Sequence, residues 1–254
     1  MKKCLIRFHP SFLFVALGFI LTGYFLNLII FTSIIIVHEL GHYLICKLKK
    51  FKVIEIVIYP YGGITKLEEF INRDIDDELL LATFGVIFQS LYFLIIYILF
   101  THGLIRGYAF NIFSDYHYSI LFFNLLPIYP LDGFKILNLF LAKKISYKKS
   151  NDITLYFSIL LLGYLFIQNY YTFNYAYIIV LSTLISNIIS FYKSRKYLFN
   201  RFLLERYLYN IYFNNVKVIA NMDKMHKNSI HIIKDGDKFL PEKLFLKKIF
   251  DKRY

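Results

Sequence analysis

Long apolar stretches separated by short polar segments fill most of the chain. The first has no charged residue over 11–37. A transmembrane helix needs about 20 mostly apolar residues, and one helix over 11–46 would be roughly 54 Å long at about 1.5 Å per residue. The pattern therefore predicts two helices, over 11–24 and 28–46, joined by a turn at 23–27.

Four further apolar stretches extend this pattern. They cover residues 78–100, 117–141, 153–167 and 175–192. Together the stretches predict a mainly α, polytopic membrane protein with about six transmembrane helices. The first 25 residues imitate a signal peptide but contain no small-x-small cleavage site, so we expect them to remain as the first span.

The segment 51–66 has a different pattern, in which β-branched residues alternate with others. The run then breaks at Pro60 and at Gly62 and Gly63, which is typical of a β-hairpin. An open strand edge cannot face lipid, so this short membrane-associated hairpin must line a protein-walled cavity or lie at the membrane surface. The acidic segment 72–78 after it is interpreted as a solvated connector.

The composition changes after the last apolar stretch. A basic amphipathic run is followed by a strand-like segment at 229–233, a turn at 235–237 and a helix-like segment at 241–250. We therefore predict a transmembrane domain over 1–192 and a small α/β cytoplasmic tail over 193–254.

Composition and charge support a membrane protein. The chain is 57% hydrophobic and 20% aromatic, and its net charge is +13. The basic residues gather at the ends of apolar stretches, at Lys2, Lys3, Arg7, 47–52, 143–149 and beyond Lys193. Cytoplasmic Lys and Arg set membrane orientation, so both termini are expected in the cytoplasm. Anionic lipid, rather than direct nucleic acid, is the expected partner of these charges.

His38, Glu39 and His42 form a His-Glu-Leu-Gly-His motif inside the second predicted helix. Residues four apart share a helix face, so both imidazoles can reach one metal ion. Catalytic zinc takes three protein ligands, often imidazoles, and leaves one position for water. Glu39 can accept the proton of that water. The motif therefore predicts one Zn²⁺ ion with a catalytic base beside it.

A plainer interpretation is that the two histidines are partly hydrated interfacial residues and that Glu39 pairs with a lysine. Titratable residues inside a transmembrane helix cost about 2.5–3.5 kcal/mol each on insertion scales and usually persist for function, which argues against it. The other histidines are expected to be surface or interfacial residues: His9, His102, His117, His226 and His231.

A third metal ligand is available in the interrupted fourth apolar stretch. Two prolines, Pro127 and Pro130, and Gly133 break this helix, and a broken transmembrane helix is tolerated only against protein or a watery cavity. Asp132 is the carboxylate there, although it could instead pair with Lys135 three positions on. Asn124 could bind substrate backbone or stabilise an oxyanion, or it could cap a helix.

These pieces together resemble the site-2 protease family of intramembrane zinc metalloproteases. The matching segments are the His-Glu-Leu-Gly-His motif, the glycine pair of the hairpin, and the stretch from Asn124-Leu-Leu-Pro127 to Asp132-Gly133. The resemblance covers about residues 1–192. One departure is Gly85-Val86, where other members tend to carry Gly-Pro.

The resemblance implies roles for these residues. His38, His42 and Asp132 would bind zinc, and Glu39 would be the catalytic base. Substrate-binding roles are expected for four residues of the matching segments: Asn124, Pro127, Gly62 and Gly63.

Within the family, the chain is most similar to the six-span members of endospore formers that carry a cytoplasmic tail. This similarity implies that the substrate is a membrane-associated pro-sigma factor of the mother cell, cleaved near its pro-sequence. It also implies inhibitory membrane protein partners and a location in the mother-cell membrane around the forespore. The tail resembles a shortened half of a cystathionine-β-synthase-type (CBS) domain, a module that senses nucleotides, so the resemblance allows ATP binding at the tail. About 40 residues, however, are too few for the paired motif that normally forms the nucleotide site.

Two other functions use the same residues differently. A membrane metal transporter or sensor would bind an ion at the histidines and leave Glu39 without chemistry. A membrane scaffold that binds a helix would need no stoichiometric zinc.

Overall fold

A computed structural model describes residues 5–59, 62–68, 70–172, 175–213, 215–235 and 238–251. The chain divides into two compact units. The first comprises residues 1–69 and 80–126, and the second comprises residues 70–79 and 127–254.

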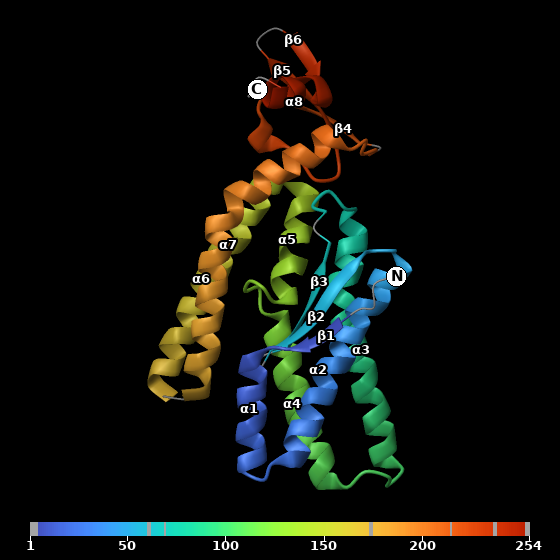
Figure 1. The fold of residues 1–254 in the computed structure, drawn as a ribbon, viewed down its shortest axis with the longest axis vertical. Coiled ribbons are helices and arrows are strands. Elements are labelled where there is room, and N and C mark those ends of the chain that lie inside the picture. Colours follow the sequence, from blue (N-terminus) through green and yellow to red (C-terminus); the bar gives the residue numbers. More distant parts are fainter. Residues whose placement is uncertain are drawn as a thin grey trace. The chain divides into compact units, whose positions relative to one another are not determined.

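Four helices and a small sheet make up the first unit (Figure 1). The helices are α1 (Pro10–Leu21), α2 (Phe25–Leu48), α3 (Ile75–Thr101, which enters this unit at Leu80) and α4 (Gly107–Leu125). The strands are β1 (Leu5–Phe8), β2 (Val53–Tyr59) and β3 (Gly62–Leu67). Helices α1 and α2 with a turn between them confirm the division predicted for the first apolar stretch.

The predicted hairpin is present as β2 and β3, which pair antiparallel. Pro60, at which the hairpin was expected to break, lies outside the described residues. The sequence did not predict β1, which pairs parallel to β2 and gives the sheet the order β1-β2-β3. Four residues are too short to display an alternating pattern, so β1 is defined by its pairing with a distant strand.

The core of the first unit forms where apolar faces of the helices meet β2. Its buried members include Ile34 and Ile35 of α2, Ile58 of β2, and Phe113 of α4. The opposite faces expose large apolar side chains, such as Leu21 with an exposed fraction of 78%. Such side chains are stable in lipid rather than in water, which fits a membrane domain.

Among the described residues, three helical segments are long and apolar enough to cross a membrane. They are Phe25–Leu48, Ile75–Thr101 and Tyr147–Gln168. The chain is therefore mainly helical with small sheets and three candidate spans, and the other expected spans stay predictions.

The expected fourth span over 117–141 is not a single helix. It is divided into α4 and α5 (Asp132–Lys144), and residues 126–131 between them are not helical. Pro127 and Pro130 explain the gap, because proline lacks the N–H donor and disfavours helical backbone in the preceding residue.

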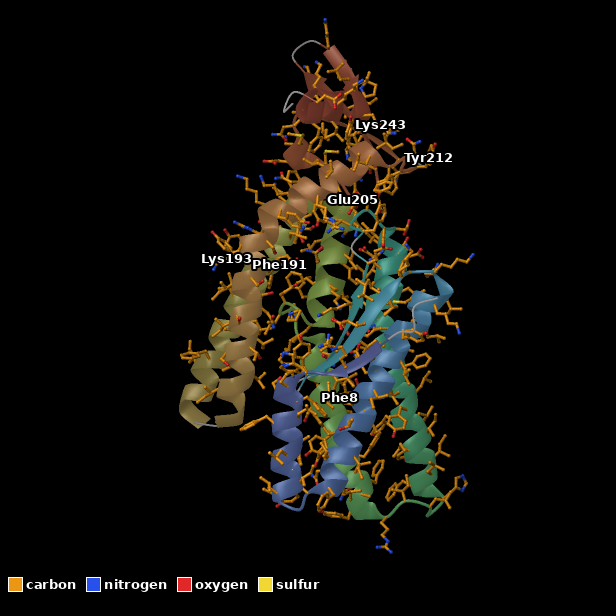
Figure 2. All side chains as sticks on the ribbon, viewed as in Figure 1. Phe8, Phe191, Lys193, Glu205, Tyr212 and Lys243 are labelled. Carbon is orange, nitrogen blue, oxygen red and sulfur yellow. The ribbon has the colours of Figure 1, made fainter. Side chains whose placement is uncertain are left out.

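The second unit continues from α5 into two long helices and the tail. These elements are α6 (Tyr147–Thr172), α7 (Tyr175–Leu208), β4 (Val216–Ile219), the 3₁₀ turn η1 (Met222–Lys224), β5 (Ile230–Asp235), β6 (Lys238–Pro241) and α8 (Glu242–Phe250). Helix α7 passes the expected boundary at residue 192 without a break. Figure 2 labels Phe191 and Lys193 there, where the apolar part of α7 gives way to its basic part. The boundary stays a prediction.

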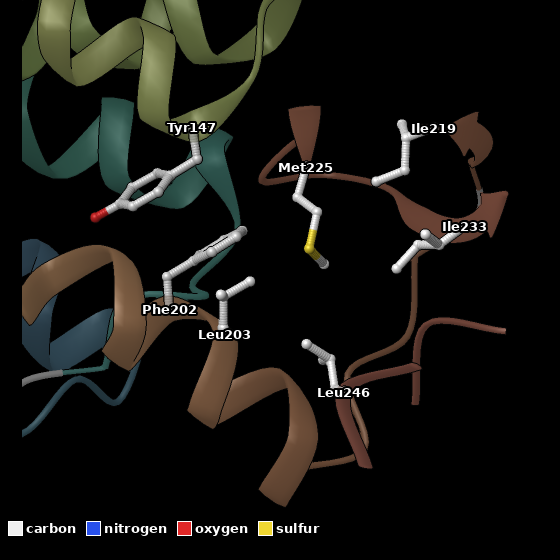
Figure 3. Packing of buried hydrophobic residues seen from close by; sticks show 7 residues of the cluster. All are labelled: Tyr147, Phe202, Leu203, Ile219, Met225, Ile233 and Leu246. Carbon is white, nitrogen blue, oxygen red and sulfur yellow. The ribbon is translucent and has the colours of Figure 1, made fainter. Parts of the chain in front are cut away.

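The tail folds on the end of α7 around a single apolar cluster. Phe202 and Leu203 of α7 belong to one buried cluster with residues from α6, β4, β5, α8 and the loop before β5, as Figure 3 shows. The strand expected at 229–233 and the helix expected at 241–250 are confirmed by β5 and α8. The turn expected at 235–237 falls largely on Gly236 and Asp237, which lie outside the described residues. β4 and β6 complete a sheet of order β4-β5-β6 and were not predicted.

Two expectations about polar residues were wrong. The supposed solvated connector contains Asn72, which is 3% exposed and donates its side-chain amide to Glu205 Oε2 and to the Phe202 carbonyl. Similarly, His117 and His231 are buried rather than at a surface or interface. In each case, residues from other segments of the chain bond or cover a polar side chain that the local composition alone predicts to be solvent-exposed.

Candidate metal centre

His38 and His42 lie on the face of α2 that packs against α3. Both side chains are buried, and their Nε2 atoms are 3.1 Å apart. The ligand atoms of His38, Glu39 and His42 all lie within 4.8 Å of one another. The spacing of four residues on a helix has therefore brought both imidazoles to one point, as the motif predicts.

A hydrogen bond on the far side of the His42 ring determines which of its two nitrogens carries the proton. His42 Nδ1 is 2.8 Å from the Leu81 carbonyl oxygen of α3. A carbonyl can only accept, so Nδ1 carries the proton and donates it. The lone pair is then on Nε2, the atom that faces His38.

The distance between the two nitrogens fits a shared zinc ion. Two ligands at about 2.0–2.1 Å from a tetrahedral zinc ion are about 3.3 Å apart. Gly85 of α3 adds a second sign, because a Cβ built there would lie 2.7 Å from His38 Nε2 and closer still to His42 Nε2. The missing side chain leaves space beside both nitrogens, and the donor set suits zinc.

Glu39 is held by β3 of the sheet. Thr65 Oγ1 donates a hydrogen bond of 2.7 Å to Glu39 Oε2, and the carboxylate is buried. A Cβ built at Gly63 would lie 2.5 Å from Glu39 Oε1, so only glycine lets this strand pass so close to the carboxylate. Sequence reasoning missed Thr65, although it is two positions from Gly63 and so points to the same face of the strand.

Two of the expected substrate-binding residues face each other in the same unit. Asn124 is buried near the end of α4, and a Cβ built at Gly62 would lie 3.5 Å from its Oδ1. Gly62 has a φ of 150°, a conformation that side-chain-bearing residues rarely adopt. The structure thus brings Gly62, Gly63 and Asn124 into the unit that contains the histidine motif.

Asp132 and Pro127 belong to the second unit. Asp132 is the first residue of α5, is 5% exposed, and accepts a 3.0 Å hydrogen bond from Lys135 Nζ at Oδ1. The ion pair that the sequence left open is therefore formed. A carboxylate has two oxygens and several acceptor sites, so this pair does not exclude a metal ion. The Pro127 carbonyl accepts a 2.8 Å hydrogen bond from Ser158 Oγ.

Comparison with known proteins gives these residues a context. The model of peptidase family M50 matches residues 26–118, which include the histidine motif. Stage IV sporulation protein FB of Bacillus subtilis (strain 168) is 31% identical over 207 residues, which are 80% of this chain and 71% of that protein. The chain belongs to peptidase family M50, the site-2 proteases. It is accordingly a zinc metalloprotease of the site-2 protease type.

Two comparisons with one archaeon extend the likeness of this site-2 protease. A zinc metalloprotease of Methanocaldococcus jannaschii is 30% identical over 131 residues, which are 50% of this chain and 38% of that protein. The solved structure of a site-2 protease from the same organism superposes with a TM-score of 0.59 at 22% identity, covering 75% of this chain and 92% of that one. At this identity the superposition supports the fold alone.

Proposed function

We propose that this site-2 protease hydrolyses a peptide bond of a membrane-associated protein, with Glu39 as the base and with His38, His42 and Asp132 as zinc ligands. One observation carries the proposal: two buried imidazoles present Nε2 atoms 3.1 Å apart, with the Glu39 carboxylate beside them, on one apolar helix. Titratable groups inside a membrane helix are costly and usually persist because they have a function.

The bound zinc ion would act as a Lewis acid, polarising the scissile carbonyl and lowering the pKa of the attacking water. Glu39 accepts the proton of that water and then donates it to the leaving amine. The hydrogen bond from Thr65 holds Oε2, so Oε1 is the oxygen we assign to proton transfer. Burial of the carboxylate keeps bulk water from competing for this proton.

The substrate is expected to bind in extended form along β3. Within the described part of the chain, β3 pairs with β2 along one edge, and β2 lies between β1 and β3. The other edge of β3 can receive a substrate strand. Gly62 and Gly63 would permit close approach of its backbone, and Asn124 and Pro127 would contact it.

The relative from Bacillus subtilis is named for sporulation. We extend the proposal accordingly to the pro-sequence of a sporulation sigma factor as the substrate. The partners of the protease would be inhibitory membrane proteins and anionic lipid. The protease would lie in the mother-cell membrane around the forespore, with both termini in the cytoplasm. The proposal includes no nucleotide at the tail.

Co-expression with candidate membrane-tethered pro-sigma factors tests the proposal. Glu39→Gln is expected to retain zinc and lose cleavage, because an amide cannot accept the proton. Glu68→Gln is the matched control, since Glu68 pairs with Lys52 at the surface, and it should cleave normally. Undiminished cleavage by Glu39→Gln would exclude the assigned base. Zinc binding without cleavage of any candidate by the unaltered chain would favour a metal transporter or sensor.

A further inference from the structure

Gln89 is a fully buried polar residue of α3 that contacts a metal-ligand candidate. Its Oε1 is 3.0 Å from His38 Nδ1, and its Nε2 is 2.9 Å from the backbone carbonyl oxygen of His117 in α4. Its exposed fraction is 0%. A buried amide without hydrogen bonds is costly, so both contacts stabilise the side chain where it lies.

These two contacts fix the direction of the amide. The His117 carbonyl can only accept, so the NH₂ group of Gln89 must face it, and the amide oxygen then faces His38. That oxygen also can only accept, so His38 Nδ1 must carry the proton and donate it. The lone pair of His38 is therefore on Nε2.

Both histidines consequently direct unprotonated nitrogens at each other. His42 has the same tautomer, imposed by the Leu81 carbonyl. Two lone pairs 3.1 Å apart repel each other unless a cation lies between them. The arrangement is thus stable with a metal ion in place, and the two acceptors on α3 are what create it.

The acceptors occupy one face of α3. Positions 81, 85 and 89 are spaced four apart, so they lie one above another on the helix. Leu81 orients His42, Gly85 leaves room for the nitrogens, and Gln89 orients His38. The contact of Leu81 uses its backbone and survives substitution, whereas the contact of Gln89 depends on its side chain.

We propose that Gln89 is a positioning residue of the metal centre. It holds His38 in the Nδ1–H tautomer with Nε2 towards the metal ion, and its bond to the His117 carbonyl ties this ligand to α4. Partners of this kind typically change metal affinity by about 10- to 100-fold when they are removed. The inference rests on the proposed zinc site.

The test measures zinc affinity of the purified full-length chain by competition with a chelator, together with the absorption spectrum of the Co²⁺-substituted protein. Gln89→Leu removes the acceptor and should weaken zinc binding by about 10- to 100-fold and alter the Co²⁺ spectrum. Gln89→Glu keeps an oxygen acceptor for His38 Nδ1 and should weaken zinc binding less than Gln89→Leu does. If Gln89→Leu does not fold, Gln89→Met replaces it.

Tyr92→Phe is the matched control. Tyr92 also lies on α3, and its hydroxyl donates a hydrogen bond to Ser33 of α2. It should leave zinc affinity and the Co²⁺ spectrum unchanged. Equal affinity of Gln89→Leu and the parent would overturn the inference, as would a loss in Gln89→Glu as large as in Gln89→Leu. A parent chain that binds no zinc would refute the zinc site itself.

Discussion

Gly85→Ala places one methyl group in the space beside the two imidazole Nε2 atoms. The added Cβ would lie 2.7 Å from His38 Nε2 and closer to His42 Nε2, so the histidines or α3 must shift. Overpacking of this kind costs about 1–3 kcal/mol. Because this strain opposes the arrangement of the two histidines around the ion, zinc binding should weaken by about 5- to 150-fold. Each 1.4 kcal/mol changes the dissociation constant about tenfold.

The assay is chelator competition on the purified variant, with the thermal unfolding midpoint measured in parallel. Gly18→Ala is the matched control, because a Cβ at Gly18 of α1 meets nothing within 4 Å. Alanine also favours a helix over glycine by about 1 kcal/mol. The control should therefore keep zinc and be no less stable. Unchanged zinc affinity in Gly85→Ala would refute the position inferred for the ion.

Two further predictions concern Thr65 and the tail. Thr65→Val removes the hydrogen bond to Glu39 Oε2. Because hydrogen bonds to charged groups are worth about 1.5–3 kcal/mol, cleavage should slow by about 10- to 100-fold while the zinc content stays unchanged. A normal cleavage rate would contradict the role of Thr65. In the tail, burial raises the pKa of Glu242. The hydrogen bond from His231 and the charge of Arg206 lower this pKa by more than burial raises it, so the pKa lies below its ordinary value of 4.5. A lowered carboxyl pKa stabilises the fold above that value, and the stabilisation is lost as the pH falls below about 4.5. Hydrogen exchange of β5 and α8, corrected for intrinsic rates, should show this loss, and an equally steep loss in Glu242→Gln would contradict the assignment.

The local features of the fold could be predicted from the sequence. The turn between α1 and α2, the hairpin and the histidine motif each depend on residues within a few positions, so periodicity and spacing report them directly. The same holds for the helix break near Pro127, because proline acts on its own backbone and on the residue before it.

Features that depend on distant partners could not be predicted in this way. Strand β1 exists through its pairing with β2, about fifty positions along the chain. Asn72 looked solvent-exposed because its neighbours are acidic, yet Glu205 and Arg206 of α7 accept from and donate to it in a buried network. Composition describes the neighbours in sequence, whereas burial depends on the neighbours in space.

The metal centre combines both kinds of feature. His38 and His42 are recognisable because one helix carries them at a spacing of four. Their tautomers, however, depend on Leu81 and Gln89, which act from a second helix running past the first. A glutamine inside an apolar helix is visible in the sequence as an anomaly, since an amide is costly there. The sequence does not identify the partner of this glutamine. When α3 packs on α2, the side chain of Gln89 becomes the acceptor that directs His38 towards the metal ion.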